Sequence, residues 1–140
     1  MRFMVLVKAD KSSEAGVLPS EAMLIKMGKF NEELVKDGVM LSGEGLHPSS
    51  KGARINFSGA KPVVIDGPFS ETKELIGGFW LISANSLEEV IERFKRCPPE
   101  TGEIEIRQVF SSEDFAPVIE TDAGRAVLAA EDEFRKRTNT

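Results

Sequence analysis

Residues 20–46 read SEAMLIKMGKFNEELVKDGVMLSGEGL, and the spacing of the apolar side chains changes once along this stretch. Its first part repeats apolar residues every three or four positions, which is the spacing of one face of a helix: Met23, Met27, Phe30 and Leu34. Ser20 stands where a helix can begin and Gly38 where one can end. We therefore expect a helix over residues 20–37, followed by a strand over residues 39–46.

Four more segments have clear patterns. Residues 3–7 (FMVLV) and 79–82 (FWLI) are apolar at every position, which is typical of strands that are covered on both faces. Ser86 begins the capping box SLEE, which predicts a second helix that ends before Pro98. Residues 104–108 alternate apolar and polar side chains, as a strand with one face in water does.

An inserted hairpin completes the order of elements. Two short β-rich runs, residues 54–57 and 62–65, are joined by the turn sequence Ser58-Gly59-Ala60. The chain then reads strand, helix, strand, hairpin, strand, helix, strand, which is βαββαβ once the hairpin is set aside. We expect an α+β fold, ferredoxin-like βαββαβ with an inserted β-hairpin, in which a four-stranded antiparallel sheet carries both helices on one face.

This arrangement leaves the other face of the sheet without a cover. Because residues 3–7 and 79–82 are apolar on both faces, that face would be a contiguous apolar patch, which soluble monomers rarely expose. A second copy packed sheet against sheet with two-fold symmetry would cover it. We therefore expect a homodimer in which Phe79 or Trp80, whichever faces away from the helices, is buried by the partner.

The chain divides into a domain at residues 1–110 and a C-terminal extension at residues 111–140. Residues 113–140 carry seven acidic and four basic side chains, and only a small apolar cluster around Val127 and Leu128. We expect this extension to be partly helical or flexible, and to be dispensable for folding of the core.

The composition excludes several classes of function. With 140 residues, 41% hydrophobic residues and a net charge of −5, the chain has the balance of a soluble globular domain. It lacks the excess of Lys and Arg on which nucleic-acid binding depends. One cysteine (Cys97) and one histidine (His47) are too few for an internal disulfide or a zinc or iron site. No segment is long and apolar enough for a signal peptide or a membrane span. We expect a cytoplasmic protein with no metal, no cofactor, no nucleic-acid partner and no membrane association.

The most distinctive sequence is DGPFSETKE at residues 66–74, which is followed by GGFW at residues 77–80. Three flanking blocks accompany it: KFNEELV at residues 29–35, GEGLHP at 43–48 and RCP at 96–98. In these blocks the chain resembles the YCII-related proteins, specifically the branch named for a DGPFAETKE-type motif, over roughly residues 1–110. The resemblance implies a ferredoxin-like fold that dimerises into an α+β barrel with a cleft beside the sheet.

The resemblance does not imply one activity. Other YCII-like proteins have been proposed to use a His–Asp pair with the histidine in the first helix, but residues 20–37 contain no histidine, so that pair is not carried over. Three functions remain open. The first is a small enzyme without metal or nucleotide, such as a lyase, an isomerase or a cofactor-free oxygenase. The second is a non-catalytic ligand-binding or regulatory module, since the branch is often encoded beside or fused to alternative sigma factors. The third is an interaction dimer without a ligand.

Candidate site residues lie around the DGPF turn and the end of the second strand. Asp66 and His47 are the candidate catalytic residues, because a carboxylate and the only imidazole could exchange protons with a substrate. The candidate ligand-binding residues are Glu44, Arg54, Pro68, Phe69, Glu71 and Lys73. We expect an open pocket here that holds an anionic or carbonyl-bearing small molecule. Two alternatives stay open, in which Asp66 caps its own turn and His47 is an ordinary surface histidine.

Overall fold

The structure, a computed structural model, describes residues 1–70 and 74–138. The elements in chain order are β1 (Arg2–Lys8), α1 (Lys11–Glu14), α2 (Glu21–Lys36), β2 (Met40–Gly45), the 3-10 helix η1 (Ser49–Lys51), β3 (Ala53–Asn56), β4 (Val63–Asp66), β5 (Ile76–Ser83), α3 (Leu87–Phe94), η3 (Pro99–Thr101), β6 (Ile104–Gln108), η4 (Ser112–Val118) and α4 (Asp122–Thr138). In this described part of the chain, no helix has the length and apolar character needed to cross a membrane.

Four strands form one antiparallel sheet in the order β2-β5-β1-β6. At its centre, Val5 of β1 lies opposite Trp80 of β5 on one side and Ile106 of β6 on the other. With α2 between β1 and β2, and α3 between β5 and β6, this order is the split βαβ arrangement of ferredoxin-like folds. The expected α+β class and ferredoxin-like order are confirmed.

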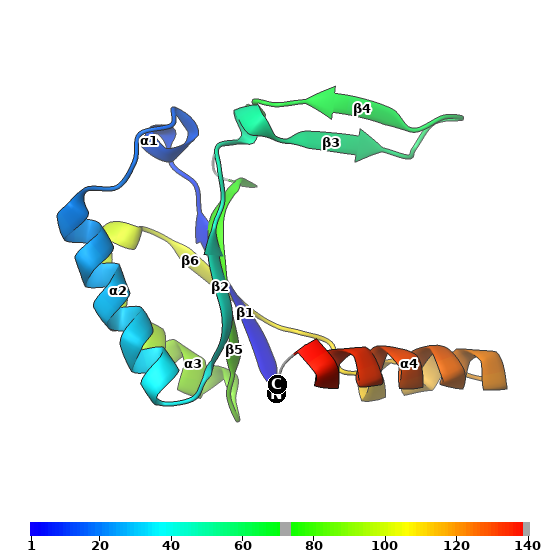
Figure 1. Cartoon of the computed structure of the whole chain (residues 1–140). Helices are drawn as coiled ribbons and strands as arrows, with labels where there is room; N and C mark the ends of the chain where they lie inside the picture. Colours follow the sequence, from blue (N-terminus) through cyan, green and yellow to red (C-terminus); the bar gives the residue numbers. More distant parts are fainter. Residues whose placement is uncertain (71–73, 139–140) are drawn as a thin grey trace.

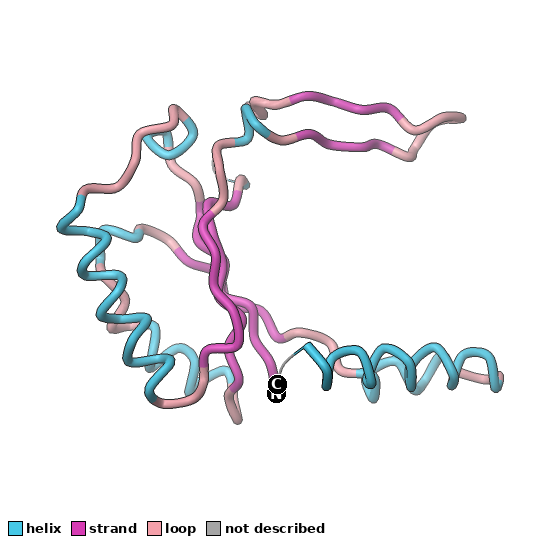
Figure 2. The backbone as a smooth tube through the Cα atoms, in the orientation of Figure 1, coloured by secondary structure: helices cyan, strands magenta, loops and turns pink. Residues whose placement is uncertain are grey.

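Helices α2 and α3 cover one face of this sheet (Figures 1 and 2). The core between helices and sheet consists of buried side chains from both layers: Phe3, Val5, Phe30, Leu34, Trp80, Ile82, Ala84, Val90 and Phe94. At its centre the ring of Trp80 meets Phe30 of α2 and Phe94 of α3 edge-on, with centroid distances of 6.1 and 5.1 Å. Such edge-to-face contacts add to the stabilisation that area burial gives. The aromatic cluster therefore fixes both helices on the same strand.

Both predicted helices begin at the predicted caps. The Oγ atoms of Ser20 and Ser86 each accept a hydrogen bond from the backbone N–H three residues on, at 3.1 and 3.2 Å. A short helix absent from our expectations, α1, precedes α2. It begins at a reciprocal capping box in which Asp10 and Ser13 each bond the backbone of the other.

The opposite face of the sheet, which we call the open face, carries apolar side chains that alternate with the core residues. Leu6 of β1 lies opposite Phe79 of β5, and Met4 lies opposite Leu81. All four are only partly buried within one chain. Of the two aromatic residues considered above, Phe79 faces away from the helices, because its neighbour Trp80 packs against them.

Two elements project from the two ends of the sheet on the side of the open face (Figure 1). One is the hairpin of β3 and β4, which forms a two-stranded antiparallel sheet of its own in the segment where a hairpin was predicted. Every residue in both of its strands is exposed. The other is α4, which follows η4 in the C-terminal extension. The open face is thus framed by two arms.

Candidate functional site

A cavity of about 950 Å³ lies between the N-terminal half of α2 and the neighbouring ends of β2 and β5. On the helix side it is lined by Met23, Met27 and Asn31, which follow one another at intervals of four residues and so share one face of α2. The sheet side is lined by Trp80 and by four glycines of β2 and β5, namely Gly43, Gly45, Gly77 and Gly78, while α1 and η1 contribute the outer wall. The cavity therefore has an apolar interior that ends in a polar rim.

Of these glycines, Gly45 is the one that borders open space at this end of the sheet. Gly43 lies opposite Trp80 in the ladder between β2 and β5, and Gly45 lies opposite Gly78. A Cβ atom on Gly45 would meet nothing within 4 Å, so any larger side chain there would extend into open space. A Cβ on Gly78 would lie 3.0 Å from the carbonyl oxygen of Glu44, which leaves little room for a side chain. At Gly43 a Cβ would lie 2.5 Å from the terminal methyl of Met40, so Gly43 and Gly78 allow close packing, whereas the missing side chain of Gly45 leaves space beside α2.

Trp80 joins the cavity to the core. Its indole Nε1 donates a hydrogen bond to Oδ1 of Asn31 at 2.8 Å, and the ring itself is 5% exposed. Because both residues line the cavity, this bond fixes the position of α2 beside the hollow. Trp80 is also the only tryptophan of a chain that has no tyrosine, so its fluorescence reports on the cavity directly.

Two of the predicted site residues line the cavity. Glu44 at the end of β2 and His47 just beyond it both belong to the lining and are both exposed. Glu44 lies opposite Phe79, so its carboxylate is on the open-face side of the strand, and Lys8, another lining residue, has its Nζ 3.2 Å from Oε1 of Glu105, which lies opposite Leu6. The exposed imidazole of His47 is thus the candidate proton carrier at the rim.

The other predicted residues lie elsewhere. Asp66 is the exposed last residue of β4 and, like Pro68, does not line the cavity. The guanidinium carbon of Arg54 lies 3.8 Å from the ring centroid of Phe69, a cation–π contact at the base of the hairpin. Glu71 and Lys73 lie outside the described residues. The structure therefore brings Glu44 and His47 together without Asp66, and a ligand-binding role for the DGPF residues stays a prediction.

The DGPF turn contributes to the cavity indirectly, through a chain of hydrogen bonds that we call the brace. The backbone N–H of Phe69 donates to Oγ of Ser49 at 3.0 Å. Ser49 in turn donates both its hydroxyl and its backbone N–H to the carboxylate of Glu14, the latter at 2.9 Å. Glu14 lines the cavity, as do the neighbours of Ser49 on either side, Pro48 and Ser50. The brace therefore ties the turn, η1 and α1 into one wall.

Neither Glu14 nor Ser49 was among the predicted site residues. The capping box at Asp10 could have revealed α1, and with it the position of Glu14. Nothing in the sequence, however, indicates that a carboxylate bonds a serine 35 residues further along the chain. Contacts of that kind depend on the tertiary structure.

Two further observations concern thiol and metal chemistry. Burial raises the pKa of the Cys97 thiol, whose Sγ lies 3.4 Å from Oγ1 of Thr101, so this cysteine is a poor nucleophile. Within residues 1–70 and 74–138, no three His, Cys, Asp or Glu side chains gather closely enough to hold a metal ion.

Residues 1–113 match the family model of the YCII-related domain. The chain belongs to the YCII-related family. An uncharacterised protein of Rhizobium meliloti (strain 1021) is 31% identical over 90 residues, which make up 62% of this chain and 73% of that protein. Among solved structures, the chain is similar to the 5-chloro-2-hydroxyhydroquinone dehydrochlorinase of Burkholderia phenoliruptrix AC1100 in complex with 2,5-dihydroxybenzoquinone. That match covers 81% of this chain and 98% of the other, with a TM-score of 0.44 and 14% identity. Membership of the DGPF branch within the YCII-related family stays a prediction.

The first prediction concerns Gly67 in this YCII-related chain. A Cβ there would lie 1.6 Å from the carbonyl oxygen of Ser49, so Gly67→Ala must displace the turn from η1. We expect faster amide hydrogen exchange at Phe69 and a loss of about 1–3 kcal/mol in the free energy of unfolding. Gly59→Ala is the matched control, because its Cβ would have its nearest neighbour at 3.8 Å. Wild-type exchange and stability in Gly67→Ala would contradict the brace.

The second prediction concerns the titration of Glu14. The two hydrogen bonds from Ser49 lower the pKa of Glu14 below its usual range. Because the folded-state pKa is the lower one, the ionised carboxylate stabilises the brace above the unfolded-state pKa, and this stabilisation is lost as the pH falls through the folded-state pKa. Ser49→Ala should raise the pKa of Glu14, as followed by carbon NMR of its carboxyl group. Ser50→Ala should leave that pKa unchanged; an equal rise in both variants would show that Ser49 is not the cause.

Proposed function

We propose that this YCII-related protein binds a small organic molecule in the cavity between α2 and the glycine-containing ends of β2 and β5, without a metal or a nucleotide. The observation that carries the proposal is the cavity beside Gly45, where the missing side chain opens into empty space. Its volume of about 950 Å³ lies within the range of small-molecule sites. An apolar interior with a few polar groups at one end is also the composition of such sites.

The side chains inside the cavity and at its rim decide which molecules can bind. Met23, Met27 and Trp80 offer polarisable and aromatic contacts for an apolar body, while His47 stands where a polar or anionic group would emerge. If the molecule is also transformed, His47 is the residue that exchanges a proton with it, and the reaction is of a lyase, isomerase or cofactor-free oxygenase type. Binding comes first in either case and can be measured without knowing the natural ligand.

The third prediction tests binding with anilinonaphthalene sulfonate, an aromatic anion that fluoresces in apolar sites. Energy transfer from Trp80 to the bound dye reports occupation of the cavity, because the chain has no other tryptophan. Gly45→Leu fills the hollow and should weaken dye binding at least tenfold. Gly28→Leu is the matched control, since Gly28 also has open space around it but does not line the cavity. Equal affinity in the two variants would contradict the proposal.

The same assay separates the roles of the predicted catalytic residues. Small organic acids and carbonyl compounds are screened by displacement of the dye, and any that displace it are tested for turnover. For a molecule that is turned over, His47→Ala should lower kcat by a larger factor than it lowers the affinity for the dye. Asp66→Asn should change neither, because Asp66 does not line the cavity.

We also propose that the protein is a homodimer that packs through the open face. Met4, Leu6, Phe79 and Leu81 form an apolar surface on the side away from α2 and α3. Apolar patches of this kind on soluble proteins mark interaction surfaces. A two-fold contact buries the same patch on both copies, so that one surface is its own complement.

The fourth prediction follows from this packing. Leu81→Asp places a charge on the open face and should convert a dimer at micromolar concentration into a folded monomer, as measured by sedimentation equilibrium and circular dichroism. Leu81 is preferred to Phe79 because Phe79 also lines the cavity. Ile25→Asp on the outer face of α2, where Ile25 is 50% exposed, is the matched control and should remain dimeric. A monomeric wild-type protein would end the proposal.

A further inference from the structure

Helix α4 stands apart from the core of its own chain. The buried core and the side chains packed against it come from residues 3–106, and none of them belongs to the described residues of α4. The helix also begins beyond residue 113, where the match to the YCII-related domain ends. In Figure 1 it extends away from the sheet on the side of the open face. Packing against α2 or α3 therefore does not explain the position of α4.

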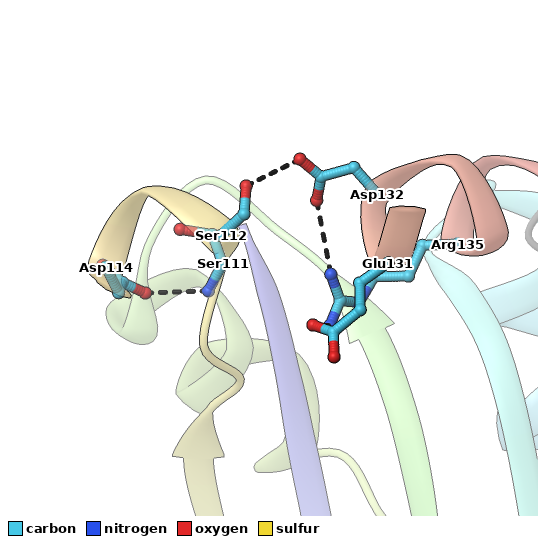
Figure 3. A network of polar contacts seen from close by, with 6 residues as sticks. All are labelled: Ser111, Ser112, Asp114, Glu131, Asp132 and Arg135. Carbon is cyan, nitrogen blue, oxygen red and sulfur yellow. Dashed lines mark hydrogen bonds and ion pairs between the residues drawn. The ribbon is translucent and has the colours of Figure 1, made fainter. Parts of the chain in front are cut away.

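One face of α4 is fastened to η4, as Figure 3 shows. Oδ2 of Asp132 accepts a hydrogen bond from Oγ of Ser112 at 2.8 Å, and Arg135 bonds Asp132 and Glu131 at 3.3 Å each. The turn of η4 is itself held by a hydrogen bond of 2.8 Å from the backbone N–H of Ser111 to Asp114. Of these contacts, the Ser112–Asp132 hydrogen bond joins α4 to η4, and the others order the two elements locally.

A second face of α4 is apolar and exposed to solvent. It consists of four positions at intervals of four, three and four residues, which places them along one stripe: Ala123, Val127, Ala130 and Phe134. Val127 and Phe134 are each 57% exposed. The third face is polar and includes Arg125, Glu133 and Lys136. A helix with an exposed apolar stripe beside a polar face normally buries that stripe against another element.

The hairpin of β3 and β4 at the other end of the sheet also exposes apolar side chains. Hairpins of two strands are marginal in water unless they pack against something, and every residue in both strands of this one is exposed. One face of the hairpin carries the opposed pair Ile55 and Val64, 57% and 64% exposed. The hairpin, the open face and α4, each of which carries exposed apolar side chains, thus border one space (Figure 1).

We infer that the occupant of this space is a second copy of the chain, and that α4 is an arm whose stripe packs along that copy. This inference rests on the homodimer proposed above. Two sheets packed face to face lie about 10 Å apart, whereas a helix of 17 residues is about 26 Å long. An arm that leaves one sheet on its open side therefore runs past the second sheet and lies alongside it. An identical chain brings the same three surfaces, so a two-fold contact covers all of them at once.

The experiment compares dissociation constants of the dimer, measured by sedimentation equilibrium. A chain truncated after Glu120, which lacks α4, and the variant Val127→Asp should each dissociate at least tenfold more readily than the wild type. The matched control is Ala129→Asp, which places an aspartate on the polar face of the same helix, between Arg125 and Glu133, and should leave the dissociation constant unchanged. Near-ultraviolet circular dichroism of the aromatic core and dye binding at the cavity check that every variant keeps its core, since α4 contributes no residue to the core cluster or to the cavity lining.

The outcomes separate this inference from the homodimer proposal, on which it rests, and from the ligand-binding proposal. A wild-type dimer whose dissociation constant is the same after truncation, or in Val127→Asp, overturns the arm and leaves the dimer standing. Equal weakening in Val127→Asp and Ala129→Asp also overturns it, because the stripe then has no special role. A wild-type monomer overturns both the arm and the dimer, while dye binding in the cavity is decided separately by Gly45→Leu.

Discussion

The hydrogen bond between Trp80 and Asn31 is the point on which the rest of the structure depends. Through its ring, Trp80 holds α2 and α3 on the central strand β5, and through its Nε1 it holds α2 at a fixed place beside the hollow. A buried indole N–H without a partner would cost about 1–3 kcal/mol, so this bond also fixes the rotation of α2 about its axis. The lining of the cavity by Met23 and Met27 follows from that rotation, since they lie on the same face of the helix as Asn31.

The two faces of the sheet consequently have different roles. The face toward the helices provides the core at one end and, where glycines replace larger side chains, the cavity at the other. The open face carries partly buried apolar side chains and is bordered by the two arms. A ligand site and an interaction surface can therefore coexist on one small sheet without competing for the same side chains. Phe79 is the exception, because it belongs to the open face and also lines the cavity, so an event at one surface can reach the other there.

Local sequence patterns predicted the elements well, and long-range contacts explain what they missed. Helix α2 follows from the spacing of Met23, Met27, Phe30 and Leu34, and α3 from the cap at Ser86, because both signals act within a few residues. The position of the DGPF turn could not be predicted from such local patterns. Its sequence suggested that Asp66 would meet Glu44 and His47, yet the turn is bound to η1 by Ser49, and only Glu44 and His47 reach the cavity. The pairing of Ser49 with Glu14 joins residues with no local relation in the sequence, so no pattern could reveal it.

The way in which the motif is held also limits what it can do. Gly67 can lie against the backbone of Ser49 because it has no side chain, and Phe69 binds Oγ of Ser49 through its backbone N–H. Gly67 also donates its own N–H to the carbonyl of Gly52 at 3.0 Å. The described part of the DGPF motif thus enters the brace through backbone groups, while the carboxylate of Asp66 is exposed and outside the cavity lining. Gly67 and Phe69 thus specify the shape of one wall of the cavity, whereas the exposed imidazole of His47 stays the candidate for chemistry at its rim.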